Sequence, residues 1–375
     1  MIIYKRASKK DFNELIGHLN SVFSVSNGRE ISLERSYPRV FKENDKEMGC
    51  HLTARKDGKI CGAAASYPLV YRAGGAELKI RANGNVAVSE DCRGLGIMSE
   101  IMNRIDADDR QEGADLCYLH GARARYRRFG FELCGFEYRF VFTRSMLGKG
   151  EPEYKLKYVD LRSSHEALKR QAFELNNSQH TGFLWDYDEF TDALSSKLSV
   201  PYAVISEDGA FEGYMCVRED EPVINQMCLR SEEMLSHIIR GYMEKSGTDR
   251  LNMGLSAYDR LEEQALICCE KYNIVQPANF KIINFKKVTE AFMREKSLHE
   301  DMPDGCITVD SEIFGKWSIQ KKGKEISVAP FNGDAEIVLP GFSVYTFLFG
   351  TVAQKTDNPL VKAWFPLPLY CPYLS

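Results

Sequence analysis

One stretch of the sequence indicates the fold: residues 85–105, which read NVAVSEDCRGLGIMSEIMNRI. The run from Val86 to Val88 is typical of a short strand. A polar connection leads from it to Arg93-Gly94-Leu95-Gly96, and apolar residues then recur at helical spacing from Ile97 to Ile105. The stretch therefore predicts a strand, a glycine loop and an amphipathic helix, in that order.

The glycine loop has the form of a binding site for a pyrophosphate. The N-terminus of a helix presents backbone N–H groups to an anion, and side chains at the closest points would block the approach. Glycine removes that obstacle. The preceding strand can offer unpaired backbone groups to the rest of such a ligand and can stabilise an oxyanion. An ordinary tight turn between strand and helix is the alternative.

Two stretches together resemble one known family. The loop Arg93-Gly94-Leu95-Gly96-Ile97 resembles the Arg/Gln-x-x-Gly-x-Gly/Ala signature of GNAT acetyltransferases, with Met98 where the family has a small residue. The run Tyr126-Arg127-Arg128-Phe129-Gly130-Phe131 looks like the tyrosine segment of that family. The resemblance implies an acetyl-CoA dependent N-acetyltransferase. It implies that the coenzyme contacts Val86, Ala87, Val88, Arg93, Gly94, Leu95, Gly96, Ile97, Met98, Ser99, Gly121 and Ala122.

Tyr126 is the catalytic acid that this resemblance implies. In direct transfer an amine attacks the thioester, and the leaving thiolate requires a proton or a hydrogen bond. A phenol of pKa about 10 can protonate a sulfur of pKa about 8.5 only when it is held against that sulfur. The alternative is a tyrosine that packs on the coenzyme or in the core. The arginines around it can form either a phosphate site or a solvated basic face.

The order of predicted elements divides the chain into three parts and predicts an α+β fold. Residues 1–148 form a catalytic GNAT domain, a mixed sheet flanked by helices, with residues 138–143 as its closing strand. Residues 149–286 repeat the order at low similarity and lack the Arg-x-x-Gly loop, so we expect a second, degenerate GNAT domain. Residues 287–375 form a smaller α/β domain.

This architecture resembles the enhanced intracellular survival family of bacterial acetyltransferases. The resemblance implies a third domain like sterol carrier protein and assembly as a hexamer. It also implies that the C-terminal carboxylate, here that of Ser375, returns to the active site as general base. Because residues 365–375 carry no charged side chain, we expect this tail to pack rather than to be exposed to water. A frayed terminus is the alternative.

Composition excludes several classes of protein. The chain has 375 residues, of which 44% are hydrophobic and 27% charged, and its net charge of −4 does not indicate nucleic-acid binding. It shows neither a signal peptide nor an apolar run long enough for a membrane span, so we expect a cytoplasmic protein. Eleven cysteines, an odd number without C-x-x-C spacing, indicate reduced thiols, and no metal site is expected.

The acceptor is the open question. The resemblance implies a small-molecule amine such as an aminoglycoside or a polyamine, with protein lysine as an alternative. A wide acidic pocket would favour polycations, and a narrow groove would favour peptides. A different class of protein, a non-catalytic acyl-CoA or lipid-binding module, is disfavoured because Arg93, Gly96 and Tyr126 are all present. A peptidyl transferase that uses aminoacyl-tRNA is disfavoured by the acidic net charge.

Overall fold

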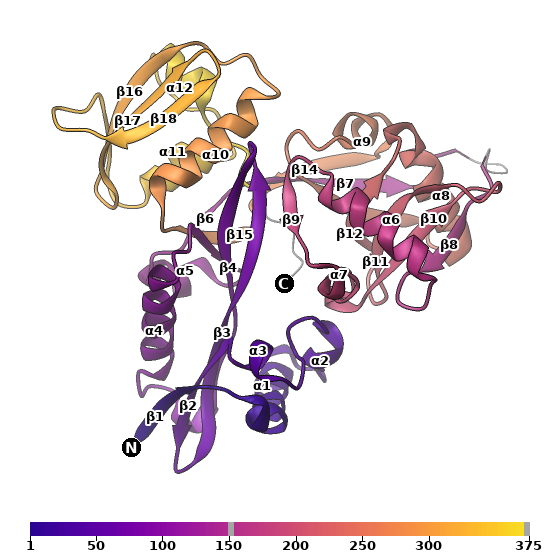
Figure 1. Cartoon of the computed structure of the whole chain (residues 1–375), viewed down its shortest axis with the longest axis horizontal. Helices are drawn as coiled ribbons and strands as arrows, with labels where there is room; N and C mark the ends of the chain where they lie inside the picture. The colour runs from indigo at the N-terminus through magenta and orange to yellow at the C-terminus, as the bar shows by residue number, and fades with distance from the viewer. Residues whose placement is uncertain (149–153, 371–375) are drawn as a thin grey trace.

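The computed structural model describes residues 1–148 and 154–370, which form three β-sheets with helices around them (Figure 1). The first sheet has eight strands in the order β1-β2-β3-β4-β5-β15-β6, and β9 pairs with β3. These strands are β1 (Ile2–Arg6), β2 (His51–Lys56), β3 (Lys59–Ala73), β4 (Ala76–Val88), β5 (Leu116–Leu119), β6 (Glu132–Cys134), β9 (Gly182–Leu184) and β15 (Ala278–Ile282). Only β4 and β5 run parallel within this sheet.

Helices cover both faces of the first sheet (Figure 1). They are α1 (Phe12–Asn27), α2 (Leu33–Ser36), α3 (Asp45–Met48), α4 (Ile97–Gln111) and α5 (Arg123–Tyr126), with 3-10 turns η1 (Lys9–Asp11), η2 (Glu90–Cys92) and η3 (Arg127–Phe129). Side chains alternate between the two faces of β3. Ala63 and Ala65 belong to the core under α1, whereas Ala64 belongs to the core under α4. The two helices therefore pack on opposite faces.

The second sheet has seven strands in the order β14-β7-β13-β12-β11-β10-β8. They are β7 (Glu137–Thr143), β8 (Lys157–Asp160), β10 (Ser199–Ile205), β11 (Phe211–Arg218), β12 (Val223–Leu229), β13 (Arg250–Leu255) and β14 (Lys271–Val275). The associated helices are α6 (Glu166–Asn177), α7 (Tyr187–Leu194), α8 (Leu235–Ser246) and α9 (Glu262–Cys268), with η4 (Ser196–Leu198) and η5 (Glu232–Met234). Like the first sheet, it combines an antiparallel run with one parallel pair, β12 and β13.

The third sheet has four strands in the order β18-β17-β16-β19. These are β16 (Gly305–Ser311), β17 (Gly315–Lys322), β18 (Glu325–Pro330) and β19 (Ile337–Leu339), and the helices are α10 (Phe285–Ser297), α11 (Ser343–Phe349) and α12 (Pro359–Trp364). Helix α10 packs between β18 and the long hairpin formed by β3 and β4 (Figure 1). The third part is thus attached to the tip of the first sheet.

Two strands are exchanged between the first and second sheets. The sequence predicts residues 138–143 as the closing strand of the first part, but in the structure this strand, β7, pairs with β13 and β14 of the second sheet. In return β15 pairs with β5 and β6 of the first sheet. The strand itself was predicted correctly, and its position was not, because an apolar run does not specify its partner. The predicted boundaries at residues 148 and 286 stay predictions.

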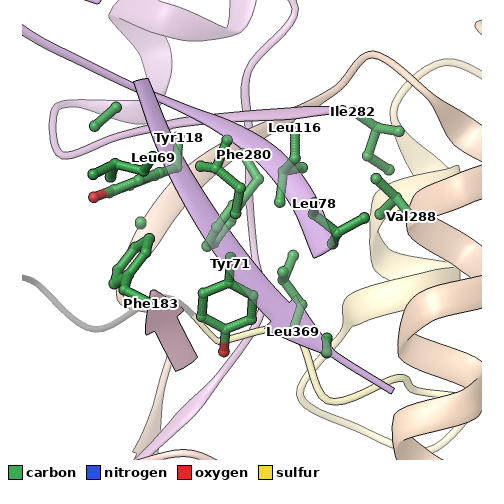
Figure 2. Packing of buried hydrophobic residues seen from close by; sticks show 14 of the residues in the cluster. Leu69, Tyr71, Leu78, Leu116, Tyr118, Phe183, Phe280, Ile282, Val288 and Leu369 are labelled. Atoms are coloured by element: carbon green, nitrogen blue, oxygen red, sulfur yellow. The ribbon is translucent and has the colours of Figure 1, made fainter. Parts of the chain in front are cut away.

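A buried cluster joins the three parts where these elements meet (Figure 2). It includes Tyr71 and Leu78 of the hairpin, Tyr118 of β5, Phe280 of β15, Phe183 of β9, Val288 of α10 and Leu369. Phe365, Leu367 and Leu369 are each at most 1% exposed, and the carbonyl of Leu369 accepts a hydrogen bond from the N–H of Phe136 at 3.1 Å. The expectation that the tail packs is confirmed as far as residue 370. Ser375 lies outside the described residues.

Candidate active site

The first sheet opens where β4 and β5 separate. These parallel strands pair at Ile80 with Leu116, Arg81 with Cys117 and Ala82 with Tyr118. Strand β4 continues to Val88, whereas β5 ends at Leu119. In the described part of the chain, their pairing ends at Ala82. The backbone of residues 83–88 is therefore available to a ligand lying between the strands.

A bulge in β4 sharpens this opening. Against β3, Ala87 lies opposite Ala63, and Gly84 lies opposite Ala65, so one additional residue is inserted in β4. Asn85 takes a left-handed conformation with φ of 54°. Its side-chain N–H donates to the hydroxyl of Tyr67 at 2.5 Å. The run Asn83-Gly84-Asn85 is the sequence signal that could have identified this feature, because Asn and Gly tolerate left-handed backbone.

A buried hydrogen-bond chain holds the bulge in place. The Tyr67 hydroxyl lies 2.9 Å from Nε2 of His51, and Nδ1 of His51 lies 3.2 Å from the carbonyl of Glu47. With Nδ1 carrying the proton, Nε2 accepts from Tyr67 and every group in the chain is paired. Burial lowers the pKa of His51 to about 4, which keeps the ring neutral at pH 7. The bulge is therefore fixed by side chains from β2 and β3.

Replacing Tyr67 with Phe is expected to destabilise the fold by about 1–3 kcal/mol, because it leaves Nε2 of His51 and the Asn85 amide without this partner. The same change frees the bulge, so the acetyl-CoA that the resemblance implies should bind more weakly. Chemical denaturation and calorimetric titration measure the two effects. The control is Tyr154→Phe, since Tyr154 is 41% exposed. Equal stability of both variants would contradict this role for Tyr67.

The glycine loop is open at the surface and leads into α4. Gly94 and Gly96 have φ of 80° and 77°, and Gly96 caps the helix. Among the described residues, nothing lies within 4 Å of a Cβ built on either glycine. Ile97 is buried against Gly62 of β3, where a Cβ would lie 2.7 Å from its Cγ2. The helix is thus docked tightly while its N-terminal amides face an unobstructed surface.

Gly121 and Tyr126 form a tightly fitted pair just after β5. A Cβ on Gly121 would lie 2.3 Å from Cε2 of Tyr126, so only glycine allows the ring to lie against this backbone. Tyr126 is 6% exposed, and burial raises the pKa of its phenol, partly offset by Arg125. The carbonyl of Gly121 accepts a hydrogen bond from the Asn279 side chain at 2.8 Å. Strand β15 thereby helps to position the tyrosine.

The arginines around Tyr126 divide into two groups. Arg123 and Arg127 both bond to Glu132, which is 1% exposed, and the Arg127 guanidinium also lies 4.8 Å from the ring centre of Phe342. Arg125 and Arg128 are exposed, and Arg128 approaches Sδ of Met98 at 3.9 Å. Arg128 stands beside the start of α4, where it can meet phosphates, whereas Arg125 lines a cavity together with Tyr126. The first group has a structural role.

A cavity of about 550 Å³ lies between the opened strands and the second part of the chain. It brings together three of the predicted residues, Val86, Gly121 and Tyr126. The remaining predicted contacts lie nearby in the chain. Ala87 and Val88 end β4, residues 93–99 form the glycine loop and the start of α4, and Ala122 follows Gly121. The opposite wall has no recognisable signal in the sequence and carries Lys197, Leu198, Arg218, Asp220 and Glu221.

The charge of the cavity is mixed. Its basic side chains are Arg29, Arg125, Lys197 and Arg218, and its carboxylates are Asp220 and Glu221. A second cavity of about 520 Å³ shares Leu198 with it and is richer in carboxylates. That cavity is lined by Glu34, Glu166, Asp188, Asp192 and Glu219, with Arg35, Arg162 and Lys169 as cations. A cation is therefore attracted to this second cavity more strongly than to the cavity that contains Tyr126.

Within residues 1–148 and 154–370, no group of three or more His, Cys, Asp or Glu side chains is arranged to hold a metal ion. In the same part of the chain, none of the helices is long and apolar enough to cross a membrane.

Comparison with known proteins identifies the first part of the chain and the fold of the whole. Residues 3–134 match the family described as "Acetyltransferase (GNAT) domain". A probable N-acyltransferase from Enterococcus faecalis V583 shares 14% identity and a TM-score of 0.70 over 98% of each chain. A GCN5-related N-acetyltransferase from Kribbella flavida shares 14% identity and a TM-score of 0.70, covering 100% of this chain and 98% of that one. Eis1 from Mycobacterium abscessus shares 12% identity and a TM-score of 0.65 over 99% of each.

No curated protein matches the chain. The solved structures show that the chain has their fold over nearly its whole length. The matched domain makes the chain an acetyl-CoA dependent acyltransferase, as the loop and tyrosine segment predict. The domain uses acetyl-CoA, and the exposed glycine loop before α4 and the separated strands fit such a ligand.

Proposed function

We propose that the chain transfers the acetyl group of acetyl-CoA to a primary amine bound in the cavity between the first and second sheets. The observation that carries this proposal is the position of Tyr126. Its ring lies against Gly121 where β4 and β5 separate, and it lines the cavity that would receive the amine. The resemblance to N-acetyltransferases is consistent with this chemistry.

Different residues of the first part of the chain would bind the coenzyme and donate the proton. The amides at the start of α4 and Arg93 would hold the coenzyme phosphates, while the backbone of residues 86–88 would bind the pantetheine arm and polarise the thioester carbonyl. The thioester would supply the activated acetyl group. Tyr126 would donate its proton to the leaving sulfur, since a phenol is protonated at neutral pH and burial raises its pKa further.

The general base in this proposal is the carboxylate of Ser375. The described tail supports it, because Leu367 and Leu369 are buried and Tyr370 lies beside Tyr71 and Phe183. Tyr71 and Phe183 in turn belong to the same hydrophobic cluster as Tyr118. The ring of Tyr118 lies 5.9 Å from the ring of His120, and both residues line the cavity, so the tail packs against elements that form the site. Ser375 is five residues beyond Tyr370, and five extended residues span at most about 17 Å. The proposal therefore requires the acceptor amine to lie within about 17 Å of Tyr370.

For the whole chain we propose two tandem GNAT domains followed by a domain like sterol carrier protein, as in the enhanced intracellular survival family. The second sheet repeats the antiparallel run and parallel pair of the first, which supports a duplicated origin. Cytoplasmic location and a hexameric assembly belong to the same proposal. The acceptor would be an aminoglycoside, a polyamine or a similar amine, since the second cavity, which meets the first at Leu198, is rich in carboxylates. A protein lysine is the second candidate.

The test follows thiol release from acetyl-CoA with aminoglycosides, spermidine, lysine peptides and amino acids as acceptors. Turnover is expected with at least one amine, and adding two glycines after Ser375 should reduce it at least tenfold, because the carboxylate is displaced. The control carries two glycines before Met1, which is fully exposed. If acetyl-CoA does not bind in calorimetry, the glycine loop is only a turn and a non-catalytic module becomes the better explanation. If the two extensions behave alike, Ser375 is not the base.

A further inference from the structure

Lys197 projects from the second part of the chain into the cavity that contains Tyr126. It lies in η4, between α7 and β10, and the cavity is lined by Lys197 together with Val86, His120 and Tyr126 of the first sheet. Both Lys197 and His120 line this cavity, and burial together with the charge of Lys197 lowers the pKa of His120. Since His120 and Gly121 directly follow β5, the lysine faces the end of the strands that separate.

The backbone at this position is held in an unfavourable conformation. Lys197 and Leu198 have φ of 57° and 59°, two consecutive non-glycine residues in the left-handed region. Such a conformation costs free energy and persists only where surrounding structure enforces it. Here the carbonyl of Leu198 accepts from the N–H of Glu219 at 3.0 Å, and Ser196 and Ser199 on either side are buried. The fold thus fixes Lys197 at the cavity wall.

The surroundings of Lys197 disfavour its charged form. Burial is the main cause, and Arg218 and Arg139 add repulsion, while Glu137 and Glu221 oppose it. The pKa of Lys197 falls to about 6, so most of its amine is neutral at pH 7. Neutral primary amine is the form that attacks a thioester. The lysine therefore has the chemical character of the substrate that the proposed reaction uses.

We infer that Lys197 is itself an acetyl acceptor, so that the protein acetylates its own cavity wall when no other amine is present. The inference rests on the proposed acetyl transfer. Nζ of Lys197 forms a bond to the acetyl carbon, and the bond from that carbon to sulfur breaks. Tyr126 gives its proton to the sulfur, and a proton from the lysine nitrogen restores the phenol. The products are acetyl-lysine and free coenzyme A, with no further reactant.

Self-acetylation would change the site that carries it. An amide at Nζ is no longer nucleophilic, and the added acetyl group occupies part of the cavity. The modified protein is therefore expected to acetylate external amines more slowly than the unmodified protein. A bound amine would protect Lys197 by occupying the same space.

The experiment incubates the full-length protein with acetyl-CoA alone and follows intact mass, with peptide mapping to locate the acetyl group. One acetyl group is expected on Lys197. Its rate should rise with pH as the amine deprotonates, with a midpoint near the pKa of about 6. Tyr126→Phe should slow it at least tenfold, and Lys197→Arg should abolish it. Lys281, whose side chain is 9% exposed and pairs with Asp106, is an internal control that should stay unmodified.

Two outcomes would overturn the inference. If external amines are acetylated while Lys197 stays unmodified, self-acetylation is wrong and the proposed function stands. If acetyl phosphate, which cannot occupy the coenzyme site, modifies Lys197 as fast as acetyl-CoA does, the lysine is merely reactive and the site does not direct the transfer. A failure to bind acetyl-CoA would overturn the proposed function and this inference together, and calorimetry separates that case from the first two.

Discussion

Replacing Tyr126 with Phe is expected to lower the turnover of any accepted amine by about 10²–10⁴-fold, the usual contribution of a general acid. Phe preserves the ring that packs against Gly121, so the fold and the shape of the cavity should be maintained. The variant lacks only the hydroxyl, which in a phenol is protonated at neutral pH and whose pKa burial raises further. The leaving thiolate would then receive its proton more slowly.

The measurement is kcat and KM for thiol release, together with the affinity for acetyl-CoA. Loss should appear in kcat with binding of acetyl-CoA unchanged, since the hydroxyl acts on the leaving group. Tyr272→Phe is the matched control, because Tyr272 lies on β14 of the second sheet and is 46% exposed. Full activity of Tyr126→Phe would exclude the phenol as the acid and leave Tyr126 with a packing role only.

Replacing Gly74 with Ala is expected to destabilise the fold by about 2–4 kcal/mol, from overpacking and backbone strain together. Gly74 forms the tip of the hairpin between β3 and β4, with φ of 53°. A Cβ there would lie 2.3 Å from the carbonyl oxygen of Ala291 and 2.6 Å from the backbone nitrogen of Glu295, both on α10. Neither backbone atom can move without shifting the helix.

Gly75 provides an internal control for this prediction. Its φ of 74° is also positive, but in the described structure nothing lies within 4 Å of a Cβ at that position. Gly75→Ala should therefore cost only about 1 kcal/mol, the conformational part. Chemical denaturation compares the two variants. Equal loss in both would show that α10 does not press on the hairpin tip. A smaller loss of stability for Gly74→Ala than for Gly75→Ala would also contradict the contact between Gly74 and α10.

Local features of the site could be predicted from sequence because each rests on neighbouring residues. The strand, the glycine loop and α4 follow one another within residues 85–111, and their residue types specify each element. The same is true of Tyr126 after β5. Features that depend on distant contacts could not be predicted. The Tyr67 hydroxyl joins His51 and Asn85, which are 16 and 18 residues away.

Lys197 had no sequence signal at all. It stands in the run Ser195-Ser196-Lys197-Leu198-Ser199, which contains no glycine to indicate left-handed backbone. Its low pKa arises from burial and from Arg218 and Arg139, which tertiary packing brings together. The exchange of β7 and β15 was missed for a similar reason. Residues 138–143 were predicted as a strand and residues 278–282 were not, and only the packed structure decides which sheet each one joins.

This exchange of strands has a consequence for synthesis on the ribosome. Strand β15, at residues 278–282, lies between β5 and β6 in the first sheet. The growing chain therefore cannot complete that sheet until almost three quarters of the protein has been made. Until then β5 and β6 have unpaired edges, which other chains can pair with. Nascent protein released before residue 282 should consequently aggregate more readily than the full-length product, even though such a fragment contains the glycine loop and Tyr126.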